Sequence, residues 1–256
     1  MEKKSIKDIE RMLAEIESEN DPFILSIKED KRKGVQTLLK RWGKRRLEQH
    51  QLLEQFKEMQ KYERSLWTRG CQLIAGIDEV GRGPLAGPVV AAAVILPEDF
   101  HLPGLTDSKK LSPLKRKHFL HYIKEHAISF GIGVVDSKRI DQINIYEATK
   151  FAMVEAVKNL HHTPDHLLID AMKLDLPIEQ TSIIKGDSTS ISIAAASVLA
   201  KETRDTYMKN LAREFPHYGF DKNMGYGTQE HLIALQEVGV TREHRQSFSP
   251  VKEMVD

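Results

Sequence analysis

The sequence predicts an α/β fold, in which a β-sheet is covered by helices and is preceded by a helical extension. Two apolar runs, residues 71–80 and 87–97, lie on either side of a glycine-rich turn and are typical of buried strands. A third apolar run, residues 127–136, follows, and helical and strand patterns then alternate along the chain. Such an alternation is typical of a sheet with helices on the outside.

The first 70 residues have the periodicity of helices. Apolar residues recur at helical spacing from Ile6 to Ile16, and an Asn-Asp-Pro sequence at residues 20–22 then breaks the pattern. A second stretch, about residues 35–65, is amphipathic and dense in Lys, Glu and Gln, as expected for one or two helices. We therefore expect a helical, charge-rich extension over residues 1–70.

Capping and breaking signals predict the elements that follow. Ser112, followed by a proline, is a helix start and predicts a helix to residue 127. A long helix that ends before Pro216 is expected to begin at Asp187 or Ser188. The other expected elements are a helix over residues 144–162 with Asn144 as its cap, short strands at residues 166–170 and 181–187, and a last helix near residues 228–238.

Composition excludes several classes of protein. A chain of 256 residues has room for one large domain, or for a domain with an appendage. Its single cysteine, Cys71, excludes an internal disulfide framework and a multi-cysteine metal site. The first ten residues are too charged for a secretory signal, and no uncharged apolar stretch approaches the roughly 20 residues that a membrane helix needs. We expect a cytoplasmic monomer with no membrane partner.

The net charge of +1 conceals a strong asymmetry along the chain. Residues 1–30 carry 5 Lys/Arg and 9 Asp/Glu, a net charge of −4, whereas residues 31–70 carry 12 and 4, a net charge of +8. The cations concentrate in residues 31–46, which hold eight of them and no acid. Such a run can attract a phosphate backbone, or it can be the solvated face of a helix, and composition favours neither interpretation.

Acidic residues interrupt or end three of the apolar segments: Asp78 and Glu79, Asp170, and Asp187. Ligands of α/β proteins collect at strand ends, and carboxylates that converge there relieve their repulsion by sharing a proton or by binding a cation. Oxygen ligands suit Mg²⁺ or Mn²⁺, and two such ions can promote phosphodiester cleavage. Asp170 can instead end a turn and Asp187 can cap a helix, but unpaired charges at Asp78 and Glu79 would be very costly within an apolar run.

Several motifs together resemble those of the bacterial ribonuclease HII (type 2 ribonuclease H) family. They occur in order over about residues 72–250, as GIDEVGRGPLAGPVV, LTDSKKLSP, LLIDAM, IIKGDSTSISIAAASVLAK and GYGTQEH. The resemblance implies a ribonuclease-H-like mixed sheet flanked by helices. It also implies cleavage of RNA in RNA–DNA hybrids and incision on the 5′ side of a ribonucleotide embedded in DNA, which leaves 5′-phosphate and 3′-hydroxyl ends. Family members are expected to lack the long N-terminal segment, so the resemblance implies nothing for residues 1–70.

The same resemblance assigns the metal site and the domains. It implies that Asp78, Glu79, Asp170 and Asp187 hold Mg²⁺ or Mn²⁺, as two ions. We expect a ribonuclease-H-like catalytic domain over residues 71–212, and a loop and helix over residues 213–256 that complete the substrate site. The expected partner is an RNA–DNA hybrid or DNA that contains ribonucleotides, and any replication or repair partner stays unknown.

The resemblance also indicates residues that contact the substrate. Gly81-Arg82-Gly83 is expected to approach the nucleic acid closely and sense the 2′-hydroxyl, although the pattern alone is typical of a plain turn. Tyr226, between two glycines, is expected to stack on the ribose. The other expected phosphate contacts are Asp107, Ser108, Lys109 and Lys110, otherwise an exposed polar loop, and Ser188 with Thr189, otherwise a helix cap.

Two other functions fit parts of the sequence. A non-catalytic module could bind hybrid duplexes through the basic segment and Tyr226, but the presence of all four acids argues against it. The GRGPLAG sequence could be a nucleotide-phosphate loop, but the segment that follows has the pattern of a strand and not of the helix that such a loop needs.

The adjacent acids Asp78 and Glu79 pose a geometric problem, because neighbouring residues of a regular strand point to opposite faces. Either the strand ends or bulges at Glu79, which the following glycines favour, or the longer side chain of Glu79 reaches round the edge of the sheet. We predict that Asp78 points at the ions and that Glu79 lies at the end of the strand.

Overall fold

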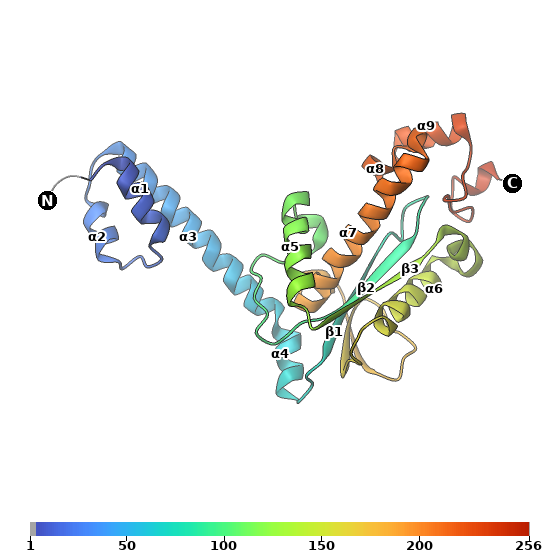
Figure 1. Cartoon of the computed structure of the whole chain (residues 1–256), viewed down its shortest axis with the longest axis horizontal. Helices are drawn as coiled ribbons and strands as arrows, with labels where there is room; N and C mark the ends of the chain where they lie inside the picture. The colour runs from blue at the N-terminus through green and yellow to red at the C-terminus, as the bar shows by residue number, and fades with distance from the viewer. Residues whose placement is uncertain (1–3, 256) are drawn as a thin grey trace. The chain divides into compact units, whose positions relative to one another are not determined.

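The computed structural model describes residues 4–255, and these residues divide after Lys57 into two compact units (Figure 1). The N-terminal unit contains α1 (Ile6–Glu15), α2 (Pro22–Lys28) and most of α3 (Lys33–Met59). The expected helical extension is therefore confirmed. By compactness the chain divides before the expected boundary at residue 70, since α4 (Lys61–Thr68) belongs with the sheet.

The three helices of the N-terminal unit enclose a small apolar core of their own. Ile9, Leu13, Ile24, Val35 and Trp42 are buried together. The indole Nε1 of Trp42 donates a hydrogen bond of 3.1 Å to the carbonyl of Ile16. The indole thus satisfies its polar atom while its ring fills the core.

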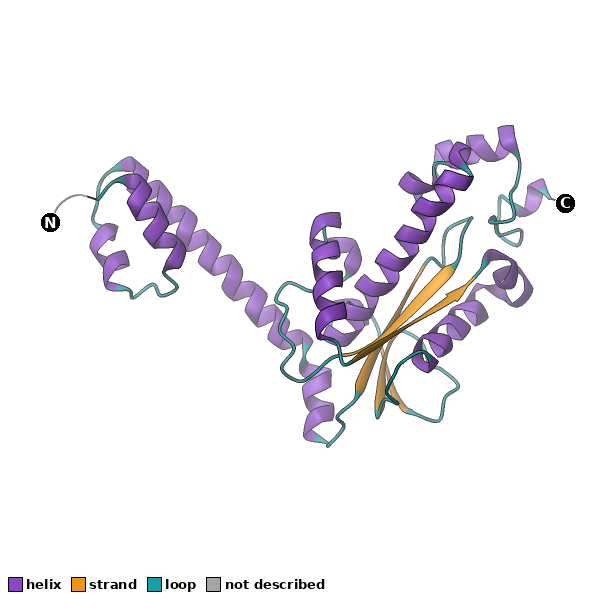
Figure 2. Cartoon of the chain, viewed as in Figure 1, coloured by secondary structure: helices purple, strands orange, loops and turns teal. Residues whose placement is uncertain are grey.

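A five-stranded mixed sheet forms the centre of the second unit (Figure 2). Its strands lie in the order β3-β2-β1-β4-β5, with β1 antiparallel to β2 and parallel to β4. This arrangement confirms the expected mixed sheet. The strands are β1 (Ile74–Val80), β2 (Val89–Ile95), β3 (Ser129–Val135), β4 (His166–Asp170) and β5 (Glu179–Ile183).

Helices cover both faces of this sheet (Figure 2). One face packs on α6 (Ser137–Lys158) and the other on α7 (Ile191–Glu214), and α7 also contacts α5 (Pro113–His126). The C-terminal elements are α8 (Phe220–Asn223) and α9 (Gln229–Val238). No helix of the described part of the chain is long and apolar enough to cross a membrane.

The contact between α7 and β1 is close enough to require glycine in the strand. A Cβ atom on Gly76 would lie 2.0 Å from the carbonyl carbon of Ser192 and 2.3 Å from the amide nitrogen of Ile193. The helix backbone therefore rests directly on the strand backbone. This contact fixes the height of α7 above the sheet.

Three expected element boundaries are wrong. The helix α7 is capped by Ser190, whose Oγ accepts from Ile193 N at 3.3 Å, because residues 186–188 first form a separate 3-10 turn. The helix α6 begins at Ser137, before Asn144. Asn144 still accepts hydrogen bonds from two amides of the next turn, but from a kink inside the helix. The strand β5 lies two residues earlier than expected at its start and ends at Ile183.

We expect the substitution Gly76→Ala to destabilise the second unit by about 3 kcal/mol or more, because the added methyl group would overlap the backbone of α7. Calorimetric unfolding measures the effect. The matched control is Gly43→Ala in α3, where an added Cβ meets nothing within 4 Å. That change should stabilise the protein by about 0.5–1 kcal/mol. A Gly76→Ala protein as stable as the parent would contradict the close contact.

Candidate metal and nucleic-acid site

The four acidic residues that the sequence singled out lie around one edge of the sheet. Asp78 and Glu79 are near the end of β1, Asp170 ends β4, and Asp187 lies in the 3-10 turn before α7. Because β1 and β4 are parallel, their carboxyl ends meet at the same edge. The Asp170 carboxylate raises the pKa of each of the other three groups, so the structure places Asp170 among them.

Asp78 is buried, with 5 % of its surface exposed. Burial raises the pKa of Asp78 well above its usual range, and the carboxylates of Glu79 and Asp170 raise it further. A hydrogen bond with Ser197 of α7 opposes this rise in pKa, as does the amide of Glu79, which donates to Asp78 Oδ1 at 2.8 Å. Ser197 Oγ lies 2.9 Å from Ser108 Oγ, so the environment of Asp78 is shared between α7 and the loop before α5.

Glu79 differs from the expectation that the strand ends or bulges there. The strand continues to Val80, with Glu79 opposite Ala91 in a regular antiparallel register. The parallel ladder with β4 stops earlier, at Ile77 opposite Ile169, so Glu79 lies beyond the edge that β4 covers. This geometry favours the other route, in which the side chain reaches round the edge. Burial raises the pKa of Glu79, Arg82 opposes the rise, and Asp170 adds to it.

Asp170 and Asp187 are coupled through the turn between them. Asp170 Oδ1 accepts a hydrogen bond of 2.7 Å from the amide of Gly186, the residue before Asp187. Burial raises the pKa of Asp187, the carboxylates of Asp107 and Asp170 raise it further, and Lys109 opposes them. Asp170 therefore has the turn-ending role that the sequence left open, and it keeps its other oxygen for a second partner.

The chemistry of this cluster fits a hard divalent cation. Its donors are all carboxylate oxygens, which Mg²⁺ and Mn²⁺ prefer. Glu79 Oε2 is buried and has no hydrogen-bond partner among residues 4–255. Within the same residues, no three His, Cys, Asp or Glu side chains lie close enough together to hold one ion. The cluster is thus a set of repelling, incompletely satisfied oxygens rather than a closed ligand shell.

The glycine-rich loop after β1 meets Tyr226 beside this cluster. Gly81 has φ +95°, a left-handed conformation that favours glycine. A Cβ atom on Gly83 would lie 3.6 Å from Tyr226 Cε1, and the tyrosine is 46 % exposed. Arg82 Nη1 lies 3.4 Å from Glu79 Oε1, which connects the loop to the carboxylates. The structure therefore brings together the residues expected to sense the substrate.

Other expected contacts have internal roles. The side chain of Ser108 is buried against Ser197, and Asp107 Oδ1 accepts from Lys109 N at 2.9 Å, so neither expected phosphate contact is free in the way that the sequence suggested. The amides of Ser188 and Thr189 donate to Lys185 and Gly186, which corrects the expectation of free helix N-terminal amides. Lys109 and Lys110 are exposed, and Lys110 Nζ donates to Ser188 Oγ at 3.1 Å.

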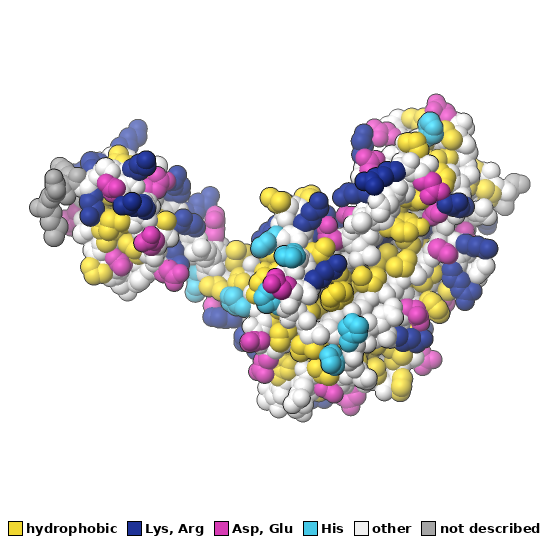
Figure 3. Space-filling view, viewed as in Figure 1, with side chains coloured by type: hydrophobic (Ala, Val, Ile, Leu, Met, Phe, Trp, Pro, Cys, Tyr) yellow, Lys and Arg dark blue, Asp and Glu magenta, His cyan; other side chains and the backbone are white. Residues whose placement is uncertain are grey.

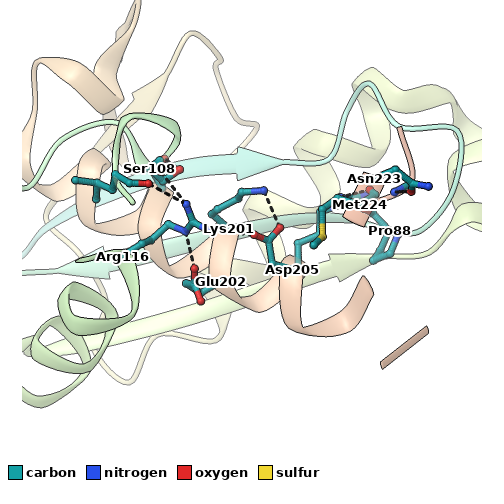
Figure 4. A network of polar contacts seen from close by, with 12 residues as sticks. Pro88, Ser108, Arg116, Lys201, Glu202, Asp205, Asn223 and Met224 are labelled. Atoms are coloured by element: carbon teal, nitrogen blue, oxygen red, sulfur yellow. Dashed lines mark hydrogen bonds and ion pairs between the residues drawn. The ribbon is translucent and has the colours of Figure 1, made fainter. Parts of the chain in front are cut away.

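A row of polar side chains on α7, with their partners, was not predicted from the sequence (Figure 4). Arg116 of α5 bonds Glu202 Oε1 at 2.5 Å and the carbonyl of Ser108 at 3.3 Å, which holds the loop of Asp107–Lys109 against α7. Figure 4 shows Ser108, Arg116 and Glu202 at one end of the view and Pro88, Asn223 and Met224 at the other. A charged residue inside a helix rich in alanine was the available signal.

The buried carboxylate of Glu63 in α4 was also missed. Its Oε1 accepts hydrogen bonds of 2.6 Å from Ser190 Oγ and Ser192 Oγ and one of 3.0 Å from Ser192 N. Glu63 thus occupies the N-terminus of α7, directly after the turn that carries Asp187. Its position in a charged, helical stretch gave no sign of burial.

Two buried histidines support the loop that carries Tyr226, called here the tyrosine loop, between α8 and α9. Thr241 N donates to His244 Nδ1 at 3.0 Å, which places the proton of that ring on Nε2. His244 Nε2 can then donate to His231 Nε2 at 3.0 Å, and His231 Nδ1 to the carbonyl of Tyr226 at 2.9 Å. Burial lowers the pKa of His231, and burial together with His231 lowers the pKa of His244 to about 4, so both rings are neutral at pH 7.

The sheet and the helices on its two faces define the fold class of the protein, the ribonuclease H fold. The same fold occurs in the ribonuclease H2 of Pyrococcus horikoshii OT3, with a TM-score of 0.60 and 24% identity over 71% of this chain and 96% of that one. It also occurs in a ribonuclease HIII crystallised with Mn²⁺, with a TM-score of 0.55 and 20% identity over 72% of this chain and 70% of that one.

Sequence comparison gives the particular family. Residues 75–251 match the family described as Ribonuclease HII, and residues 5–67 match its N-terminal domain. The Ribonuclease HII of Bacillus cereus (strain G9842) is 57% identical over 255 residues, with 100% of this chain and 99% of that one covered. That of Geobacillus sp. (strain WCH70) is 55% identical over 256 residues, with 100% and 92% covered. The chain belongs to the ribonuclease HII family and is an endoribonuclease that acts on RNA–DNA hybrids.

The likeness extends to the N-terminal segment. The expectation that family members lack this segment is wrong for these relatives, because the match begins at residue 5 and the full chain is covered. The N-terminal unit is therefore a shared part of these proteins and not an addition peculiar to this chain.

We expect Asp78→Asn to stabilise the metal-free protein at pH 7 by about 1–3 kcal/mol, because burial and the neighbouring carboxylates disfavour the charged form of Asp78. Because the folded state raises the pKa of Asp78, stability is lost as the pH rises through that pKa. The gain from the substitution should therefore shrink as the pH falls. Denaturant unfolding in EDTA at a series of pH values measures it.

The control is Asp165→Ala, at the residue immediately before β4. Asp165 Oδ2 accepts hydrogen bonds of 2.8 Å from the amides of Gln72 and Leu73, which lower the pKa of Asp165. This carboxylate is satisfied, so its removal should destabilise the protein. A destabilising effect of Asp78→Asn in EDTA would show that the carboxylate cluster is not under electrostatic strain.

Proposed function

We propose that this chain incises duplex DNA on the 5′ side of an embedded ribonucleotide, as well as the RNA strand of hybrids, and leaves 5′-phosphate and 3′-hydroxyl ends. The observation that carries this proposal is that Gly83 faces the ring of Tyr226, in the loop whose Arg82 lies 3.4 Å from Glu79 of the carboxylate cluster. A ring and a backbone loop that meet in this way can test a single sugar for its 2′-hydroxyl. The neighbouring carboxylates then face the phosphate that adjoins that sugar.

The proposed ligands of the cations are Asp78, Glu79, Asp170 and Asp187. Two divalent cations held there, Mg²⁺ or Mn²⁺, would supply an activated water and would stabilise the leaving oxygen. Divalent-metal dependence is a property of this class of nucleases, and the related ribonuclease HIII was crystallised with Mn²⁺. The orphaned Glu79 Oε2 and the raised pKa of Asp78 support a site that is completed by positive charge.

The protein's own side chains divide the remaining work. Arg82, half-exposed, can exchange its 3.4 Å contact with Glu79 for a contact with a substrate phosphate. Lys109 and Lys110 are exposed on the side of Asp187 and can bind the backbone on either side of the reacting phosphate. Asp78 must lose its proton before it can bind a cation, because the folded state raises its pKa.

The test is a duplex that carries one ribonucleotide, incubated with the full chain and Mg²⁺. We expect a single incision on its 5′ side, and a rate at least 100-fold lower for Asp78→Asn and for Asp170→Asn, since each removes a proposed ligand. Gel analysis of end-labelled strands gives the position and the end groups. Absence of incision by the parent protein, or undiminished incision by Asp78→Asn, would overturn the proposal.

We further propose that the N-terminal unit binds the phosphate backbone. Lys33, Lys40 and Lys44 of α3 are exposed and fall on one line of the helix, opposite the buried face that contains Val35 and Trp42. On the face drawn in Figure 3, Lys and Arg side chains gather over this unit, with acidic side chains among them. A line of lysines opposite a packed face presents its charges to a partner without loss of stability.

Changing Lys33, Lys40 and Lys44 to Gln should weaken duplex binding and flatten its salt dependence by about 0.9 in log–log slope for each phosphate that these side chains neutralise. The rate at saturating substrate should not change, because the catalytic residues lie in the other unit. The control changes three exposed lysines of the sheet-bearing unit, Lys117, Lys124 and Lys158, by the same charge. Equal effects of the two triple variants would refute a specific role for α3.

A further inference from the structure

Two fully buried arginines lie beneath the glycine-rich loop and the tyrosine loop. Arg204 of α7 and Arg245 near the C-terminus are both 0 % exposed. Within the described residues neither forms an ion pair, and the hydrogen bonds of both guanidinium groups go to backbone carbonyls. A guanidinium without a counter-ion is an unusual and costly occupant of a protein interior.

Arg245 binds the loop that carries Arg82. Its Nη2 donates to the carbonyl of Gly81 at 2.5 Å and its Nη1 to that of Arg82 at 3.0 Å. Nε and Nη2 both donate to the carbonyl of Gly87, at 3.0 and 2.8 Å. The planar fork of one side chain thus closes the two ends of the loop on each other.

Arg204 joins the same loop to the segment before Tyr226. Its Nε donates to the carbonyl of Pro88 at 2.8 Å and its Nη2 to that of Ala86 at 3.1 Å. Its Nη1 donates to the carbonyl of Met224 at 2.9 Å. Figure 4 shows Pro88 and Met224 close together at the same end of the view. The two arginines therefore make one rigid body from residues that are more than a hundred positions apart.

Burial disfavours the charged form of both Arg204 and Arg245. Burial lowers the pKa of Arg204 to about 10, and burial together with Arg204 lowers the pKa of Arg245 to about 9. Both groups still carry their charge at pH 7. Two positive charges therefore lie beneath a surface that must approach an anionic backbone, and they are screened less by salt than exposed lysines are.

In the glycine-rich loop, carbonyls are bound to Arg245 while two of the amides are unpaired within residues 4–255. The carbonyls of Gly81 and Arg82 point inward and accept hydrogen bonds from Arg245. The amides of Arg82 and Gly83, by contrast, donate to no protein group in the described part of the chain. Gly83 also faces the ring of Tyr226, since a Cβ atom on Gly83 would lie 3.6 Å from Tyr226 Cε1.

We propose that Arg245 and Arg204 are positioning residues that turn the carbonyls of the glycine-rich loop inward, so that the amides of Arg82 and Gly83 donate to a sugar or phosphate oxygen of the ribonucleotide next to Tyr226. This inference rests on the proposed function and adds the source of its selectivity. The loop thus acts as the hydrogen-bond donor and the substrate oxygen as the acceptor. The two buried guanidinium groups keep the loop in this conformation, and their positive charge attracts the phosphate.

The test compares affinities for two duplexes of one sequence, with a single ribonucleotide or with DNA alone, in Ca²⁺ in place of Mg²⁺. Arg245→Lys keeps the charge but replaces a five-donor fork by a point donor that cannot hold three carbonyls. We expect the parent protein to prefer the ribonucleotide duplex and Arg245→Lys to reduce that preference about tenfold, the value of one hydrogen bond to a charged group.

The matched control is Met153→Ala, a buried substitution on α6 that lowers stability without touching either loop. It should leave the preference unchanged, since general destabilisation affects both duplexes equally. A folded Arg245→Lys protein with the full preference of the parent would overturn the inference. If the parent protein incises no ribonucleotide duplex in Mg²⁺, the proposed function fails, which is a distinct result.

Hydrogen exchange on the unmodified protein gives a second measurement that does not depend on the folding of a variant. The amides of Arg82 and Gly83 should exchange quickly in the free protein. The ribonucleotide duplex should slow their exchange at least tenfold, and the all-DNA duplex should not. Equal exchange with and without the ribonucleotide duplex would show that these amides do not bind it.

Discussion

The close contact of α7 with β1 at Gly76 is the constraint on which the site depends. Because no side chain separates the two backbones, the position of α7 over the sheet is set by van der Waals contact between main chains. The position of α7 therefore determines which segments its polar side chains can reach. Ser190 and Ser192 meet Glu63, Ser197 meets Ser108, Glu202 meets Arg116, and Arg204 meets the loop carbonyls. One helix thereby sets the relative positions of several separate segments.

The sheet-bearing unit contains buried charges of both signs that have no full counter-charge among its described residues. Carboxylates with raised pKa values gather at the edge of the sheet, and two guanidinium groups lie beneath the adjacent loops, where they bind carbonyls. In the proposed function, metal ions would neutralise the carboxylates, while a phosphate at the loop surface would lie in the field of the two buried guanidinium groups without contacting them. The carboxylates thus lower the stability of the metal-free protein, and the proposed activity depends on the same groups, which sets activity against stability.

Local patterns in the sequence predicted most of the fold, because strands and helix caps depend on neighbouring residues. Ser112, the apolar runs of β1 and β2 and the helical extension were all found in this way. The long-range parts were not predictable. Ser190 and Asp187 are both good cap residues, and only the 3-10 turn, which depends on contact with Asp170, decides between them. The roles of Arg204 and Arg245 could not be predicted, because their partners are backbone carbonyls, which have no residue-specific signal.

The bond between Glu63 and the start of α7 has a consequence for how the two units cooperate. Glu63 anchors the chain to the sheet-bearing unit only a few residues after Lys57, where the N-terminal unit ends. The connection between the units is therefore short in sequence, and backbone binding by α3, as proposed above, would be linked covalently to binding by the sheet-bearing unit. Even weak binding by α3 would then prolong residence on a long duplex more than on a short one.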